Sequence, residues 1–110
     1  MILIENKRHP LTSNAPRVYV GRPSALGNPF GLSNKDDDAS RGRVCEDYRK
    51  WLSDAAEADP RVRVRDMLSR IATLEREHGT VILQCWCAPK RCHAEEIRAW
   101  IYEQYTSSNR

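Results

Sequence analysis

The chain has 110 residues, of which 18 are lysine or arginine and 15 are aspartate or glutamate, so its net charge is +3. This length fits one domain, residues 1–110, with a single hydrophobic core, and the small, mixed charge does not indicate strong binding to nucleic acid. The apolar runs are far too short for a membrane span and no secretory signal is visible at the amino terminus, which predicts a cytoplasmic protein without membrane contact.

Two short strands are predicted near the amino terminus, over residues 1–5 and 17–21. The β-favouring residues Val18, Tyr19 and Val20 define the second strand, and prolines mark the turn-rich connection before it. A polar stretch follows later, over residues 33–40. Its consecutive aspartates would point in diverging directions, so we predict a surface loop there rather than a metal site.

Apolar residues at helical spacing predict two consecutive helices, over residues 40–57 and 60–79. Ser40 is a suitable N-cap for the first helix, and Cys45 lies on its apolar face as a small core residue. The sequence RVRVR at residues 61–65 alternates like an exposed strand. The helical stripe of apolar residues continues past it, and we therefore predict helix.

A buried strand and a closing helix are predicted over residues 80–87 and 92–105. Apolar side chains occupy both faces of this strand, Trp86 among them, which is typical of an interior strand covered by helices on both sides. Strands alternating with helices indicate an α/β fold: a single small domain with a mainly parallel sheet and three helices. The pattern predicts neither the order of the strands nor an oligomeric state.

The stretch CWCAPKRCH, residues 85–93, contains three of the four cysteines and a histidine. In the predicted fold it joins a strand end to a helix start, where α/β proteins commonly bind ligands. Unpaired amides at the helix start, with Lys90 and Arg91, would attract phosphate or carboxylate. The same field would favour the thiolate of Cys92, and His93 would stabilise that thiolate or donate to an anion.

Two other interpretations of this turn remain open. Three sulfur ligands and one nitrogen would suit tetrahedral zinc, although all of them crowd into one turn instead of two separated arms: Cys85, Cys87, Cys92 and His93. Alternatively, Cys85 packs on the strand and His93 caps the helix locally, with neither ligand nor reactivity. A disulfide is not expected in a reducing compartment.

A second loop follows the second strand, in VYVGRPSALGNPFGL at residues 18–32. Its glycines permit tight turns and close ligand approach, but their spacing matches neither a dinucleotide-binding fingerprint nor a P-loop. Arg22 and Asn28 would contact a phosphate, a sugar or the edge of a base. Equally, Asn28, Pro29 and Phe30 would simply build a rigid loop with the phenyl ring buried.

Together, VYVGRPSALGNPF near the start and CWCAPKRCHAEEI near the end resemble a small bacterial and phage family described as domain of unknown function 4326. The resemblance covers nearly the whole chain and includes a helix with Tyr48, Trp51 and Leu52. It implies one folded unit and draws attention to the two loops, but it implies no particular reaction. The aspartates at residues 36–38 look like a local insertion that leaves both motifs intact.

These observations predict a nucleotide- or nucleoside-binding, enzyme-like protein with a Cys/His anion pocket between the two loops. Cys87 or Cys92 would be the nucleophile and His93 its base. Both loops would contribute ligand-binding side chains: Arg22, Asn28, Lys90 and Arg91. No cofactor is predicted in this interpretation. The alternatives are a non-catalytic zinc-binding module for protein or nucleic acid, and a small interaction protein that exposes Trp51 or Trp100.

Overall fold

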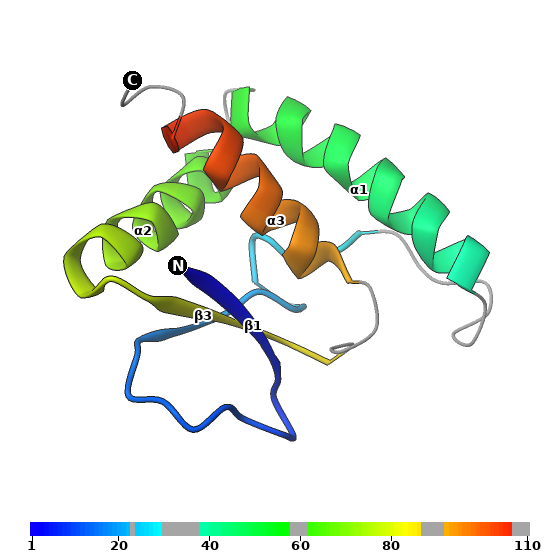
Figure 1. The fold of residues 1–110 in the computed structure, drawn as a ribbon. Helices are drawn as coiled ribbons and strands as arrows, with labels where there is room; N and C mark the ends of the chain where they lie inside the picture. Colours follow the sequence, from blue (N-terminus) through cyan, green and yellow to red (C-terminus); the bar gives the residue numbers. More distant parts are fainter. Residues whose placement is uncertain (23, 30–37, 58–61, 87–91, 107–110) are drawn as a thin grey trace.

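The computed structural model describes residues 1–22, 24–29, 38–57, 62–86 and 92–106 (Figure 1). Its strands are β1 (Ile2–Asn6), β2 (Arg17–Tyr19) and β3 (Val81–Cys85). Its helices are α1 (Asp38–Glu57), α2 (Val62–His78) and α3 (His93–Ile101), and α3 continues into a short π-helical segment, η1 (Tyr102–Thr106). The predicted fold class, an α/β domain with three helices, is confirmed over these residues. None of the helices described is long and apolar enough to cross a membrane.

All three strands are parallel, and β3, the last in sequence, is central in the order β1-β3-β2. Ile2 of β1 pairs with Val81, and Arg17 of β2 pairs with Ile82. The predicted parallel sheet is confirmed, and the structure supplies the strand order. Parallel pairing places the carboxyl ends of all three strands at one edge, so the segments that follow β2 and β3 start close together.

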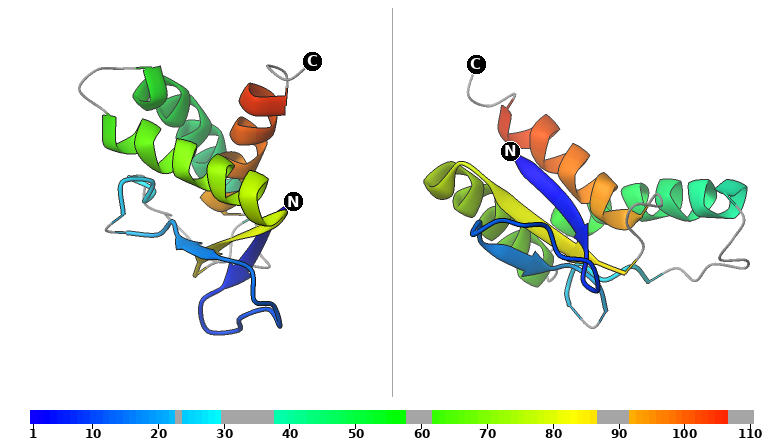
Figure 2. Two further views of the ribbon diagram at one scale, coloured as in Figure 1. Left: turned by 90° about the vertical axis from the view of Figure 1, so that its left-hand side faces the viewer. Right: turned by 60° about the horizontal axis from the view of Figure 1, so that its bottom comes forward.

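The helices pack on one face of the sheet, as Figures 1 and 2 show. The side chains of this face and the apolar sides of the helices form one continuous core. Its largest fully buried members include Ile2, Tyr48, Leu52, Leu68, Ile71, Leu83, Ile97 and Ile101. Cys45 is buried there as predicted. Trp51 and Trp100 pack against the same core and are partly buried, which argues against an interaction surface built on either ring.

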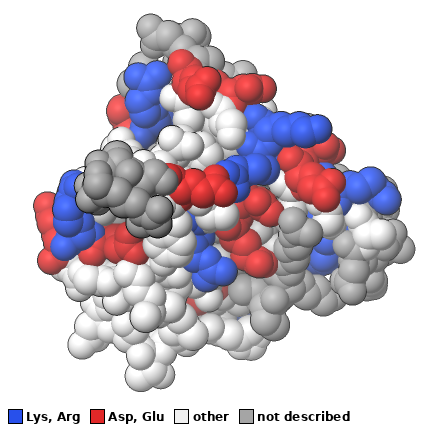
Figure 3. Space-filling view, turned by 45° about the horizontal axis from the view of Figure 1, so that its top comes forward, with Lys and Arg blue, Asp and Glu red and all other residues white. Residues whose placement is uncertain are grey.

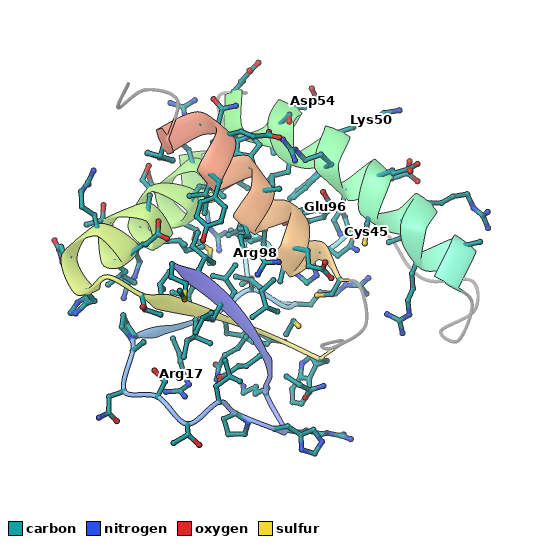
Figure 4. All side chains as sticks on the ribbon, viewed as in Figure 1. Arg17, Cys45, Lys50, Asp54, Glu96 and Arg98 are labelled. Atoms are coloured by element: carbon teal, nitrogen blue, oxygen red, sulfur yellow. The ribbon has the colours of Figure 1, made fainter. Side chains whose placement is uncertain are left out.

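The opposite face of the sheet has no helix among the described residues, so the predicted helical cover on both sides of β3 was wrong. Residues 7–16, which connect β1 to β2, lie on this side, and Figure 4 shows Arg17 there. Ile82 is buried on this face, whereas Trp86 is 50% exposed. The reason is that β3 ends at Cys85, before the predicted end, so Trp86 follows the strand instead of lying inside it.

The observed ends of helices α1 and α2 lie close to those that the sequence predicts. Helix α2 begins at Val62 and includes most of the alternating RVRVR segment, so the preference for helix there is confirmed. Gly79 follows the helix with a φ of +80°, a left-handed conformation that glycine adopts at little cost. Helix α1 begins at Asp38, slightly before the predicted start. Most of the predicted surface loop, residues 33–37, lies outside the described residues.

A buried carboxylate, that of Glu5, connects the segments on the face of the sheet opposite the helices. Glu5 is 2% exposed, and its Oε1 accepts a hydrogen bond from the Leu11 amide at 2.7 Å. Its Oε2 accepts from Arg17 Nε at 2.9 Å and from Gln84 Nε2 at 2.8 Å. Glu5 thus ties β1 to both other strands and to the connecting segment. Burial by itself would raise the pKa of Glu5, but these hydrogen bonds and the charge of Arg17 outweigh it and lower the pKa.

Replacing this carboxylate tests its role. Glu5→Gln removes the charge that faces Arg17, and we expect the free energy of unfolding at neutral pH to fall by about 1–3 kcal/mol, since Arg17 is partly exposed and stays hydrated. Because the folded state lowers the Glu5 pKa, its contribution is present above the pKa of the unfolded chain and is lost as the pH falls through the folded-state pKa. Denaturant unfolding at several acidic pH values should therefore show a weaker acid dependence in the variant. Glu46→Gln, at an exposed position of α1, is the control, and an unchanged acid dependence in Glu5→Gln would contradict the assignment.

Candidate ligand site at the carboxyl edge of the sheet

The two loops singled out in the sequence meet at the carboxyl edge of the sheet. The Val20 amide continues the pairing of β2 by donating to the Gln84 carbonyl at 3.0 Å. Turns follow in the described residues beyond it, where the Ser24 amide donates to the Gly21 carbonyl and the Gly27 amide to the Ser24 carbonyl. On the neighbouring strand, β3 leads toward α3. Figure 1 shows the first turn of α3 beside the segment that follows β2. Two segments far apart in the sequence are therefore neighbours, as the parallel sheet requires.

His93 makes the contact between these segments. Its Nε2 lies 2.7 Å from the Val20 carbonyl oxygen, and the side chain is buried. A carbonyl oxygen only accepts, so Nε2 carries the proton and donates it in this bond. The neutral ring then has its acceptor at Nδ1. This assignment fixes both the orientation and the tautomer of His93.

Tyr48 of α1 supports the same junction. Its ring packs edge-on against the His93 ring, with centroids 5.1 Å apart and an interplanar angle of 70°. Its hydroxyl donates to the Leu26 carbonyl at 2.8 Å, in the loop that follows β2, which we call the glycine loop because it contains Gly21 and Gly27. Burial raises the pKa of Tyr48, and Cys92 acts in the same direction, so the hydroxyl keeps its proton and remains a donor. The sequence did not predict this contact, because a tyrosine on an apolar helical stripe gives no signal of a polar contact at one end.

Cys92 is the N-cap of α3. Its Sγ accepts from the Ala94 amide at 3.4 Å, and its own amide donates to Glu95 Oε2 at 3.2 Å, which completes a capping box. The sulfur also lies 3.6 Å from His93 Nδ1. Since Nδ1 is the acceptor of the neutral ring, the Cys92 thiol donates to it. The pair has the arrangement of a thiol and its base, but Cys92 is only 4% exposed.

The electrostatics of the junction keep His93 neutral. Burial lowers its pKa, the hydrogen bond to Val20 acts in the opposite direction, and the positive charge of Arg22 lowers it further. A neutral imidazole is able to take the proton of the Cys92 thiol. The resulting ion pair would be buried, so proton transfer is favoured only when a negative group or a partner stabilises the imidazolium.

The first-turn amides of α3 are less available than the sequence predicts. The amides of Cys92 and Ala94 already have acceptors in the capping box, and the Glu95 amide donates to the Cys92 carbonyl at 3.0 Å. The acidic side chains of Glu95 and Glu96 also lie in this turn. An anion at these amides would have to displace the cap. Lys90 and Arg91, the predicted cations of the turn, lie outside the described residues.

The glycine loop is built by its own hydrogen bonds. Tyr19 Oη donates to the Arg22 carbonyl at 2.7 Å, and Arg22 Nε donates to the Asn28 carbonyl at 2.7 Å. A Cβ at Gly21 would lie 2.5 Å from Tyr19 Oη, so a larger residue there would have to displace the Tyr19 side chain from its hydrogen bonds. These contacts favour the rigid-loop interpretation, although Arg22 is exposed and its charge still acts on His93. The predicted burial of Phe30 concerns a residue outside the described ranges.

The sequence did not single out Ser24 of this loop as a candidate site residue. The Ser24 hydroxyl oxygen is buried and has no hydrogen-bond partner among the described residues. Buried polar groups normally find a partner in protein or water, so this hydroxyl has hydrogen-bonding capacity that the described side chains do not use. In the sequence, Ser24 was indistinguishable from a turn-forming serine.

The predicted zinc ligands are only partly brought together. Cys85 is buried and donates to the Glu5 carbonyl at 3.7 Å, while Cys92 and His93 contact each other. Cys87 lies outside the described residues. Across the ranges that the structure describes, no three Cys, His, Asp or Glu side chains are grouped so that they could hold a metal ion.

The fold and this edge define a small α/β protein with a parallel sheet, helices on one face and two loops joined at the carboxyl ends of its strands. The chain belongs to the family described as domain of unknown function 4326, whose model matches residues 4–103. The resemblance carried by the two motifs is thereby confirmed. No curated protein and no solved structure matches the chain.

The His93 contact can be tested by stability and its pH dependence. His93→Phe removes the donor to Val20 and leaves a buried carbonyl unpaired, which should lower the free energy of unfolding by about 1–3 kcal/mol. His93→Gln places an amide donor near Nε2 and should recover part of this loss. Because burial lowers the His93 pKa, its contribution is present above the unfolded-state value and is lost as the pH falls through the folded-state value.

The measurement is denaturant unfolding of wild type and both variants between about pH 8 and pH 5, the range around the ordinary histidine pKa. The exposed His78 provides the control, since His78→Gln should leave this pH dependence unchanged. A His93→Phe variant as stable as wild type would show that the bond to Val20 does not hold the loops together.

Proposed function

We propose that the chain binds a nucleotide-like small ligand at the carboxyl edge of the sheet, between residues 20–29 and the start of α3. The observation that carries the proposal is the 2.7 Å hydrogen bond from His93 Nε2 to the Val20 carbonyl. This bond places the thiol–imidazole pair of Cys92 and His93 next to the loop that carries Arg22 and Ser24. In open parallel sheets, ligands bind where segments diverge beyond the carboxyl ends of the strands.

The chemistry of the loop side supports a phosphorylated ligand. Arg22 is exposed at this edge, and its charge reaches the His93 ring. A guanidinium binds phosphate through parallel hydrogen bonds. The Ser24 hydroxyl and the Asn28 side chain provide groups suited to a sugar or a base edge. Lys90 and Arg91, the cations that the sequence predicts for this site, would add positive charge.

The thiol–imidazole pair gives this proposal its enzyme-like part. In it, the Cys92 thiol transfers its proton to His93 Nδ1, and a ligand phosphate beside Arg22 stabilises the imidazolium. The thiolate would then attack a phosphoryl or glycosidic centre, and His93 would return the proton to the leaving group. Cys87 is the alternative nucleophile. Because the Cys92 sulfur is buried, the ligand has to open the turn to reach it.

Arginine replacement tests the binding part. Arg22→Ala should weaken the binding of adenosine 5′-monophosphate about 10-fold or more, because a charged hydrogen-bonding pair contributes about 1.5–3 kcal/mol. Arg22→Lys retains the charge and should show a smaller loss. Lys50→Ala is the control, because Figure 4 shows Lys50 on the outer side of α1. Isothermal titration calorimetry measures all four proteins, and equal affinities for wild type and Arg22→Ala would contradict the proposal.

Alkylation of the buried cysteines tests whether the ligand sits beside Cys92. A ligand at ten times its dissociation constant reduces opening of its own site about 10-fold. We therefore expect a nucleotide to slow alkylation of Cys92 by roughly this factor, as followed by mass spectrometry. Cys45 is an internal control, since it is buried on a different element. Equal protection of Cys45 and Cys92 would indicate general stabilisation and would count against a site at α3.

A further inference from the structure

A second surface lies at the same edge, on the face of the sheet away from the helices. It consists of Lys7, Arg8, Tyr19 and Trp86, and we call it the Trp86 surface. Each strand contributes at its carboxyl end: Lys7 follows β1, Tyr19 ends β2 and Trp86 follows β3. Trp86 is 50% exposed, and Lys7 and Arg8 are both exposed. This surface is separate from the Cys92–His93 pair, which belongs to the helix side.

The indole of Trp86 is held in place although it faces solvent. Its Nε1 donates to Tyr19 Oη at 2.9 Å, and its backbone carbonyl accepts from Asn6 Nδ2 at 3.0 Å. The Tyr19 hydroxyl in turn donates to the Arg22 carbonyl. An exposed aromatic ring that is fixed at both its edge and its backbone loses little entropy when a ligand packs on it.

The two cations are placed beside the rings by the turn after β1. The Lys7 amide donates to the Cys85 carbonyl at 2.8 Å, and the Arg8 amide donates to Asn6 Oδ1 at 2.9 Å. Lys7 Nζ lies 4.6 Å from the centroid of the Tyr19 ring, and Arg8 Cζ lies 5.6 Å from that of Trp86. These are cation–π distances. Neither cation forms an ion pair with any of the described residues, so both charges are available to an anion.

The charge on this surface differs from that on the helix side. Figure 3 shows lysines and arginines mixed with acidic residues over the helices, where Arg49 pairs with Glu96 and Glu103. The acidic residue nearest the Trp86 surface in sequence is Glu5, and its carboxylate is buried and fully engaged by hydrogen bonds. Within the modest net charge of +3, Lys7 and Arg8 thus provide two neighbouring positive charges that no described acidic residue pairs with.

We propose that the Trp86 surface binds single-stranded nucleic acid, with a base stacked on the Trp86 indole and neighbouring phosphates paired with Lys7 and Arg8. Aromatic rings flanked by cations are the combination that single-stranded nucleic acids use, because every base has a face to stack and every nucleotide carries a phosphate. A duplex fits less well, since its bases are already stacked and paired. The proposal does not depend on the nucleotide site at α3.

The test uses a fluorescently labelled thymidine oligonucleotide of about 12 nucleotides, within the range that such sites cover. Fluorescence anisotropy should show salt-sensitive binding to wild type. Trp86→Ala should weaken it about 10-fold or more, and Trp86→Phe should recover part of the loss, because phenylalanine retains a stacking face. Half of the Trp86 side chain is exposed, so both variants should remain folded with a cooperative unfolding transition, which circular dichroism checks.

The contribution of Lys7 and Arg8 is measured separately, by the salt dependence of binding. Replacing Lys7 and Arg8 together by alanine should weaken binding and reduce the slope of log affinity against log salt concentration by about 1.4, since each phosphate contact on a single strand contributes about 0.7. Arg63→Ala with Arg70→Ala is the matched control, because both arginines are exposed on α2, on the helix side. These control replacements should change the slope much less.

The inference would be overturned if the protein bound no oligonucleotide at low salt, if it bound a duplex equally well, or if Trp86→Ala left the binding unchanged. Tighter binding of an acidic peptide that is insensitive to Trp86→Ala would also overturn it. Thymidine monophosphate separates the two sites. If Trp86→Ala weakens the monophosphate and the oligonucleotide equally, Trp86 belongs to the nucleotide site and the separate surface is refuted. If Arg22→Ala has no effect on the monophosphate while Trp86→Ala weakens the oligonucleotide, the proposed function fails and this inference stands.

Discussion

The hydrogen bond from His93 to the Val20 carbonyl is the contact on which the candidate site depends. It joins the first residue of α3 to the residue that extends β2, across 73 positions of sequence. Because the acceptor is a carbonyl, it also fixes the tautomer of the ring and leaves Nδ1 to the Cys92 thiol. The His93 side chain thus connects the loop after β2 to the start of α3 and also contacts the Cys92 thiol. Tyr48 adds a second connection between the same two regions.

The capping of α3 changes the chemistry expected of this edge. A free helix start would bind an anion with its backbone amides, whereas here Cys92 and Glu95 already occupy most of them. Negative ligand charge would therefore be bound by side chains such as Arg22, whose positive charge acts on His93. Cys92 consequently has two roles. Its sulfur caps α3, and the same sulfur contacts His93 Nδ1, which could act as its base.

The fold could be predicted largely from periodicity, and the meeting of the two loops follows from parallel strands. Three local features escaped prediction for physical reasons. Cysteine is not a favoured N-cap, so the role of Cys92 depended on the exact start of α3. Trp86 was assigned to a buried face because the strand was extended past Cys85. The polar end of Tyr48 was invisible within an apolar stripe, since the pattern records which face is buried but not what its hydroxyl contacts.

The central claim is that residues 20–28 and the start of α3 form one ligand site. Chemical-shift mapping of backbone amides during titration with adenosine 5′-monophosphate tests it most directly. Perturbations should concentrate on the amides around Val20, Arg22 and Ser24 and on those of Cys92 to Glu95, and both groups should shift with the same concentration dependence. Shifts confined to one segment, or located elsewhere on the sheet or helices, would contradict the account.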